Sequence, residues 1–162
     1  MKIHIIRHGD PDYKNDTLTK LGEEEAKKLS DHMRLFPITG LFSSPMGRAK
    51  KTADYTVKAL GIKATILPWI HEANEFMTKP QYTGLNAPVI SWNLPRYKID
   101  ELEQLGDDWV LCNWFSHPEA EDYLCNLKEG MDRLLSDYGI QKKKDGYYPK
   151  LWEQNSKSNS QM

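Results

Sequence analysis

The stretch Ile3-His4-Ile5-Ile6-Arg7-His8-Gly9-Asp10-Pro11 decides how this 162-residue sequence is interpreted. Its first half is β-branched and apolar at nearly every position, which predicts a short central strand of a parallel sheet. Turn-forming residues close the strand from Gly9 onward. Because open α/β sheets bind ligands beyond the carboxyl ends of their strands, Arg7 and His8 are candidate site residues. Taken alone, the pattern also fits a strand-end histidine beside a surface arginine.

A second stretch, Ser44-Pro45-Met46-Gly47-Arg48, also begins where a predicted strand (38–43) ends, and it opens a helix. Ser44 is the expected N-cap and Pro45 the first helical residue. Arg48 then lies in the first turn, where the partial positive charge of the helix disfavours a cation. An arginine at that position makes sense if it faces an anion that the helix terminus also attracts.

Residues 1 to 72 alternate between strand and helix signals. After a polar loop over 10–17, Thr19 is a plausible N-cap for a helix, and a third strand is expected near 64–67. The expected buried stripes are Leu21, Ala26, Leu29 and Met33 on the first helix, and Ala49, Ala53, Val57 and Leu60 on the second, which Gly61 ends. This alternation predicts an α/β domain with a mainly parallel sheet.

The character of the sequence changes after this part. Prolines and tryptophans without a regular period indicate an insertion over about 76–139, which includes a clear helix from about 118 to 138. Tyr147, Tyr148, Leu151 and Trp152 are expected to begin an edge strand. We therefore expect one domain over 1–152, and a polar tail over 153–162 that is disordered.

Composition limits the classes of partner. The net charge is −1, from 22 basic and 23 acidic residues, which predicts neither a nucleic-acid nor a membrane partner. No signal peptide or membrane span is visible, so we expect a cytoplasmic protein. Cys112 and Cys125 form no metal-ligand pair, and we interpret them as free thiols in a reducing compartment. The oligomeric state is not predicted.

Two arginines that converge with a histidine on one phosphate would form a fixed clamp. Arg7 and Arg48 would hold the phosphoryl group and neutralise charge in the transition state. Their charges would also disfavour imidazolium, so that His8 stays neutral and nucleophilic.

Three pieces of sequence then occur in order: Arg7-His8-Gly9, then Leu18-Thr19-x-x-Gly22 with Ala26, then Ser44-Pro45-x-x-Arg48-Ala49-x-x-Thr52-Ala53. Together they resemble the histidine phosphatase superfamily, also called phosphoglycerate mutase-like, over roughly residues 1 to 75. The resemblance implies a three-layer α/β/α fold and a phosphohistidine intermediate on His8. It also implies a small phosphorylated substrate held by Arg7 and Arg48, with no metal and no cofactor.

The family usually carries a glutamate just after the third strand, and Glu72 fits that place. The resemblance makes Glu72 the candidate general acid for the leaving oxygen, with Glu75 as the competitor. Such a group must be protonated at the working pH. A surface carboxylate is the alternative interpretation for both. His4 and His71 are interpreted as structural.

Two departures from the family pattern affect the functional interpretation. Asp10-Pro11 and Lys14 stand where mutases have Glu-Ser and a loop Asn, which favours a phosphatase over a phosphoglycerate mutase. The family's second catalytic histidine has no counterpart, because His117 precedes a helix and follows no strand. We therefore expect a fragment of a longer phosphatase. The alternatives are a mutase-type phosphotransferase and a phosphate-binding module with impaired catalysis, in a natural short form.

Overall fold

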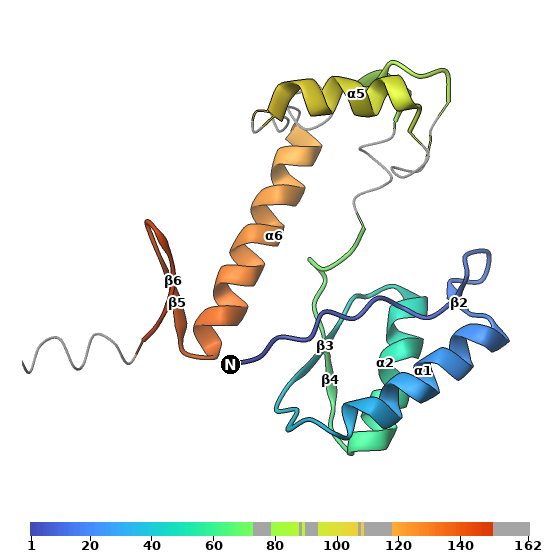
Figure 1. Cartoon of the computed structure of the whole chain (residues 1–162), viewed down its shortest axis with the longest axis vertical. Coiled ribbons are helices and arrows are strands. Elements are labelled where there is room, and N and C mark those ends of the chain that lie inside the picture. Colours follow the sequence, from blue (N-terminus) through green and yellow to red (C-terminus); the bar gives the residue numbers. More distant parts are fainter. Residues whose placement is uncertain (73–78, 88, 90–93, 107, 109–117, 151–162) are drawn as a thin grey trace, which may run out of the picture. The chain divides into compact units, whose positions relative to one another are not determined.

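The protein is represented by a computed structural model that describes residues 1–72, 79–87, 89, 94–106, 108 and 118–150. The chain divides into two compact units, Met1–Glu72 and Ala73–Met162, and each is considered by itself (Figure 1). The expectation of one domain over 1–152 with an insertion remains a prediction. The predicted disorder of 153–162 concerns residues outside those described.

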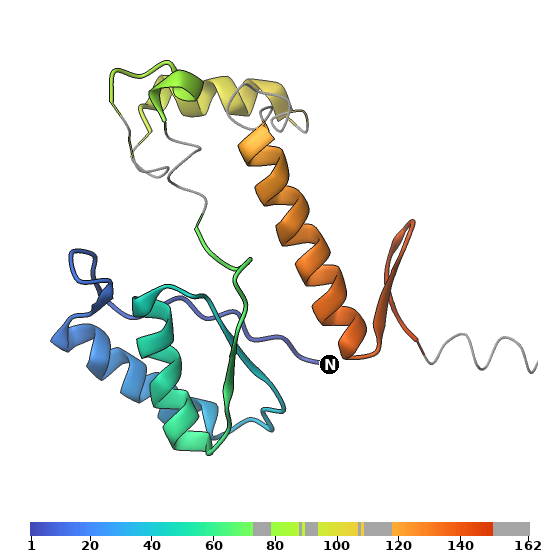
Figure 2. The same ribbon diagram turned by 180° about the vertical axis from the view of Figure 1, so that it is seen from behind.

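The first unit is built on two helices that pack side by side, α1 (Lys20–Met33) and α2 (Gly47–Leu60) (Figures 1 and 2). Thr19 caps α1 as predicted, because its hydroxyl accepts a hydrogen bond from the Gly22 N–H at 3.1 Å. Gly61 ends α2 with φ of 67°, the left-handed conformation that favours glycine at a helix end.

Among the described residues, three pairs of strands accompany the helices of the two units. In the first unit β1 (Pro11–Asp12) pairs antiparallel with β2 (Thr17–Leu18), and β3 (Leu41–Ser43) pairs parallel with β4 (Ala64–Ile66). The second and third strands expected from the sequence are therefore present, in shortened form. The α/β class is confirmed, whereas one mainly parallel sheet between two helical layers remains a prediction.

The first predicted strand is wrong in this structure. Residues 1–8 form no strand, and Ile5 is 94% exposed, with Ile3 and Ile6 exposed as well. A strand needs hydrogen bonds from a neighbour, and no described residue supplies a ladder for this segment. The apolar character of Ile3 to Ile6 marks a segment suited to pairing, but the pattern says nothing about whether a partner strand lies beside it.

The predicted stripe of α1 is partly correct. Ala26 and Met33 are buried as expected, but Leu21 is 56% exposed, and Gly22 and Ser30 are buried instead. The close approach of the chain at Gly22 rotates the helix so that the glycine, not the leucine beside it, faces inward. Backbone contact thus overrides apolar patterning in the first turn of α1.

Helix α2 begins later and buries a different face than predicted. Its N-cap is Met46, with no side-chain cap of its own, so Ser44 is not the cap and Pro45 is not helical. The buried residues are Arg48, Thr52 and Thr56, while the predicted apolar stripe is only half-buried. These three residues lie at helical spacing on one face of α2, and on that face Arg48 and Thr52 make side-chain hydrogen bonds.

The second unit contains α4 (Pro80–Thr83), α5 (Arg96–Leu105) and α6 (Pro118–Asp137), followed by the hairpin of β5 (Ile140–Lys143) and β6 (Gly146–Pro149). The predicted helix from about 118 to 138 is confirmed within one residue. The hairpin begins earlier than the edge strand expected at Tyr147. Cys125 is an exposed free thiol, whereas Cys112 lies outside the described residues.

Candidate functional site

The turn that carries His8 is attached to both helices of the first unit. The Gly9 N–H donates to Thr52 Oγ1 on α2 at 3.2 Å, and Thr52 in turn donates to the Arg48 carbonyl oxygen at 2.9 Å. On α1, Gly22 lies so close to the Asp10 backbone that a Cβ there would overlap it. Glycine at this position therefore allows the turn to approach the first turn of α1.

The imidazole of His8 is oriented by its own turn. Its Nδ1 lies 2.8 Å from the Gly9 carbonyl oxygen, an atom that can only accept, so Nδ1 is assigned the proton. The other nitrogen, Nε2, then carries a lone pair. It is buried and has no hydrogen-bond partner among the described residues. A buried, unpaired acceptor is costly unless it serves a purpose, and nucleophilic attack needs such an atom.

Arg48 is the buried cation of the site, with 7% of its side chain exposed. Its Nη1 donates to Asp16 Oδ1 at 2.9 Å, and its Nη2 donates to Glu72 Oε2 at 3.0 Å. The ring of Tyr13 lies over the guanidinium, 5.5 Å from Cζ to the ring centroid. The third nitrogen, Nε, is buried without a partner among the described residues. The site therefore holds a fixed arginine whose Nε N–H is available to a further acceptor.

Asp16 occupies the start of α2, the place where the sequence predicted a bound anion. Its Oδ2 accepts from the Gly47 N–H at 2.6 Å, and its Oδ1 accepts from the Arg48 N–H at 3.4 Å. The Gly47 N–H, followed by the N–H and guanidinium of Arg48, lowers the pKa of Asp16 below its ordinary value. Asp16 has φ of 45°, uncommon for a residue with a side chain. The carboxylate thus supplies the cap that Ser44 was expected to provide.

The structure brings some of the predicted residues together and leaves others apart. Arg48 and Glu72 form a direct ion pair, and His8 is linked through its turn to the helix that carries Arg48. Arg7 is exposed and makes no hydrogen bond or ion pair with any described residue. The competing candidates Glu75 and His117 lie outside the described residues. Sequence reasoning missed Asp16, whose only signal was an acidic residue in the loop after His8.

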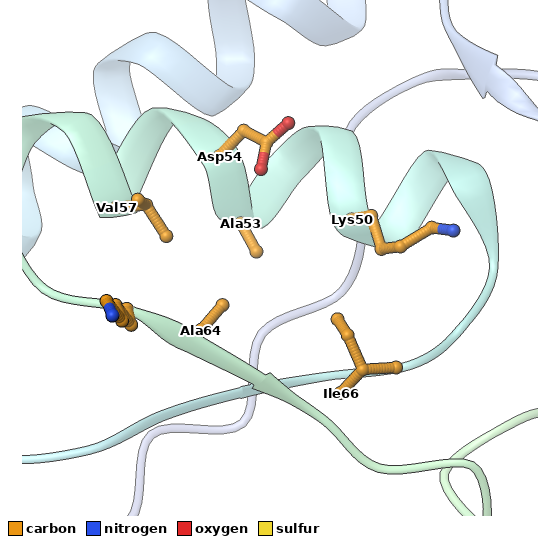
Figure 3. Close-up of a pocket in the computed structure, with 7 residues that line it drawn as sticks. Lys50, Ala53, Asp54, Val57, Ala64 and Ile66 are labelled. Carbon is orange, nitrogen blue, oxygen red and sulfur yellow. The ribbon is translucent and has the colours of Figure 1, made fainter.

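Other features of the described part of the chain lie outside this site. No group of three or more His, Cys, Asp or Glu side chains there could hold a metal ion. None of the described helices has the length and apolar character required of a membrane span. Figure 3 shows a hollow between α2 and β4. The residues of α2 that line it are on another face of the helix from Arg48 by their helical spacing. None of the predicted site residues lines it; its lining residues are Lys50, Ala53, Asp54, Val57, Lys63, Ala64 and Ile66.

Comparison with known protein families shows which family this sequence is similar to. Residues 3–80 match the histidine phosphatase superfamily (branch 1), which includes every described residue of the site. This part of the chain, which covers slightly less than half of its length, is therefore similar to the histidine phosphatase superfamily. The superfamily resemblance inferred from Arg7-His8-Gly9 and the Ser44 to Ala53 segment is confirmed.

Several proteins similar to this chain are named probable phosphoglycerate mutase GpmB. The protein of this name from Salmonella arizonae is 28% identical over 86% of the chain and 70% of its own length. Those from Erwinia tasmaniensis and Salmonella choleraesuis are 24% and 28% identical, each over 57% of the chain. The chain spans about half of the length of these two relatives, 47% in each case.

Proposed function

We propose that this chain carries the phosphoryl-transfer site of a phosphomonoester phosphatase that works through a phosphohistidine on His8. The observation that carries the proposal is the state of the His8 ring. Its Nε2 is buried and unpartnered, and its turn is attached to the helix that presents Arg48. A nucleophile with a fixed lone pair beside a buried guanidinium suits a small phosphorylated substrate.

The proposed reaction has two steps. The Nε2 lone pair attacks phosphorus, the bond from phosphorus to the ester oxygen breaks, and Glu72 gives its proton to the departing oxygen. Water then attacks the phosphohistidine, passes a proton to Glu72, and releases phosphate while His8 is restored. Arg48 stabilises the charge on the phosphoryl oxygens in both steps, and Arg7 is proposed to join it when substrate is bound.

A trapping experiment tests this mechanism. The chain is mixed with a phosphomonoester labelled in its phosphoryl group and quenched in alkali, in which phosphohistidine survives. We expect acid-labile label on the unmodified chain and none on His8→Ala, with His4→Ala as the matched control that retains it. Label that persists in His8→Ala would refute the mechanism.

A mutase-type phosphotransferase is the second candidate, and its support is the printed name of the similar proteins, probable phosphoglycerate mutase GpmB. The two activities share the first step and differ in what accepts the phosphoryl group from His8. A mutase passes it to a second substrate hydroxyl, whereas a phosphatase passes it to water. Following the label into inorganic phosphate or into an isomeric phosphate ester separates them. A phosphate-binding module without turnover would yield neither product.

Two finer expectations are part of the same proposal. We infer a cytoplasmic protein, for which small phosphorylated metabolites are accessible substrates, and cell fractionation tests this. We also propose that the α/β fold is completed as three layers around a mainly parallel sheet. Amide hydrogen exchange of the parallel strands Leu41–Ser43 and Ala64–Ile66 tests that arrangement, because strand amides in a sheet covered by helices on both faces exchange slowly.

A further inference from the structure

Arg48 is held by two carboxylates that differ in their attachment to the fold. Asp16 accepts from the backbone N–H groups of both Gly47 and Arg48 in addition to the guanidinium. A Cβ on Gly47 would overlap the Asp16 carbonyl oxygen, so backbone and side chain of Asp16 both lie against the start of α2. Glu72 reaches the guanidinium from residues 67–72, which form neither helix nor strand.

The donors of the guanidinium indicate which carboxylate a phosphate would replace. In arginine, Nε and Nη2 lie on one edge of the planar group, and that edge binds an oxyanion through two parallel hydrogen bonds. In Arg48, Nε has no partner among the described residues, and Nη2 is bonded to Glu72. Asp16 uses Nη1, which points away from this edge. A phosphate on this edge would share Nη2 with the Glu72 carboxylate, and the two anions repel each other, so the phosphate competes with Glu72 and leaves Asp16 in place.

We propose that Asp16 is a positioning residue that holds Arg48 throughout the reaction, whereas Glu72 is a resting partner that the substrate phosphate displaces. This inference rests on the proposed function and deepens it, because it links phosphate binding to the release of the proton donor. An ion-paired Glu72 has no proton to donate. Once the phosphate takes Nη2, Glu72 is released from the guanidinium and can carry the solvent-derived proton that the first step requires.

The two carboxylates are thereby expected to affect phosphate binding in opposite directions. Asp16→Asn removes the negative charge and one of the two acceptor oxygens that Gly47 and Arg48 use, so the dissociation constant for inorganic phosphate should rise about tenfold, typical of losing a hydrogen bond to a charged group. Glu72→Gln removes the competing charge, so that constant should fall about two- to fivefold, the range for a pair with a half-exposed carboxylate. In assays of activity, Asp16→Asn should mainly raise KM, whereas Glu72→Gln should mainly lower kcat.

The test is calorimetric titration of the chain and its variants with inorganic phosphate. Asp54→Asn is the matched control, because it removes the same charge from an exposed position of α2 and should leave the dissociation constant unchanged. Asp16→Glu is a second variant that keeps the charge but moves it, and it should also weaken binding. Circular dichroism melting identifies any variant that fails to fold.

Opposite shifts for Asp16→Asn and Glu72→Gln support the assignment. Shifts in the same direction overturn it while leaving the proposed function intact, because both carboxylates would then compete with phosphate or both would support Arg48. If Asp16→Asn does not fold, an unchanged or weaker affinity of Glu72→Gln overturns it. A chain that binds phosphate no better than Arg48→Ala would instead refute the proposed function, and this inference with it.

Discussion

The two segments that form the candidate site are supported very differently. Arg48 is buried on a helix and held by Asp16, Glu72 and the Tyr13 ring. The segment before His8 forms no strand, and its isoleucines are exposed. The His8 turn is held by residues that follow His8: the Gly9 N–H donates to Thr52 on α2, and the Asp10 N–H donates to Glu25 on α1 at 2.7 Å. The contrast indicates that the surroundings of Arg48, the proposed phosphate-binding residue, are preformed within the first unit. The position of His8, the proposed nucleophile, depends on a few contacts made by the residues after it.

The largest effect is expected from the well-supported half. Arg48→Ala leaves two carboxylates facing each other without their cation, so we expect phosphate binding to be lost. We also expect the free energy of unfolding to fall by about 2–3 kcal/mol. This is less than the loss for a fully buried ion pair, because both carboxylates are half-exposed. Urea denaturation and phosphate titration measure the two effects. Arg34→Ala is the control, since that side chain is 58% exposed, and a change of similar size there would contradict the comparison.

Next in size is Gly47→Ala, which probes the contact between the Asp16 loop and α2. The added methyl group overlaps the Asp16 carbonyl oxygen, so the loop must move, at a cost of about 1–3 kcal/mol. Urea denaturation should give this loss, and phosphate affinity should weaken with it. Lys50→Ala on the exposed side of the same helix serves as control. Unchanged stability in Gly47→Ala would mean that the loop is not docked there in solution.

Acid should weaken the same contact. Because the pKa of Asp16 is lowered in the folded protein, its contribution to stability is complete above the ordinary value of 3.8 and is lost as the pH falls through the folded pKa. Asp16→Asn should therefore be less stable than the unmodified chain near neutral pH, and the two should converge in acid. Denaturation from about pH 6 to about pH 2 measures this. A constant gap across that range would contradict the prediction.

The smallest effect is expected from the weakly supported half. Ile5→Thr changes a side chain that is 94% exposed, so stability should change by no more than about 0.5 kcal/mol. Met33→Ala, a buried control in the same unit, should cost about 2–4 kcal/mol. Urea denaturation of both variants gives the comparison. A loss of the size of Met33→Ala at Ile5 would show that the segment before His8 is packed in solution.

Features that depend on neighbouring residues were predictable from the sequence. The Thr19 cap, the Gly61 helix end, the helix from 118 and the presence of Arg48 at the start of a helix all follow from local chemistry. Features that depend on residues far apart in the chain were not. The Asp16 cap on Gly47 spans 31 positions, and no local pattern indicates it. The burial of Arg48, Thr52 and Thr56 was missed for the same reason, since an apolar stripe elsewhere on α2 looked more suitable.

The hydrogen bond between Gly9 and Thr52 has a further consequence for the position of His8. Arg48 and Thr52 are separated by four residues of one helix, a rise of about 6 Å that the helical repeat keeps constant. The rise of α2, not the length of a loop, therefore fixes the position of the His8 turn relative to Arg48. Loops around the site can vary in length and sequence without changing that spacing, and a single residue inserted between Arg48 and Thr52 would rotate one away from the other.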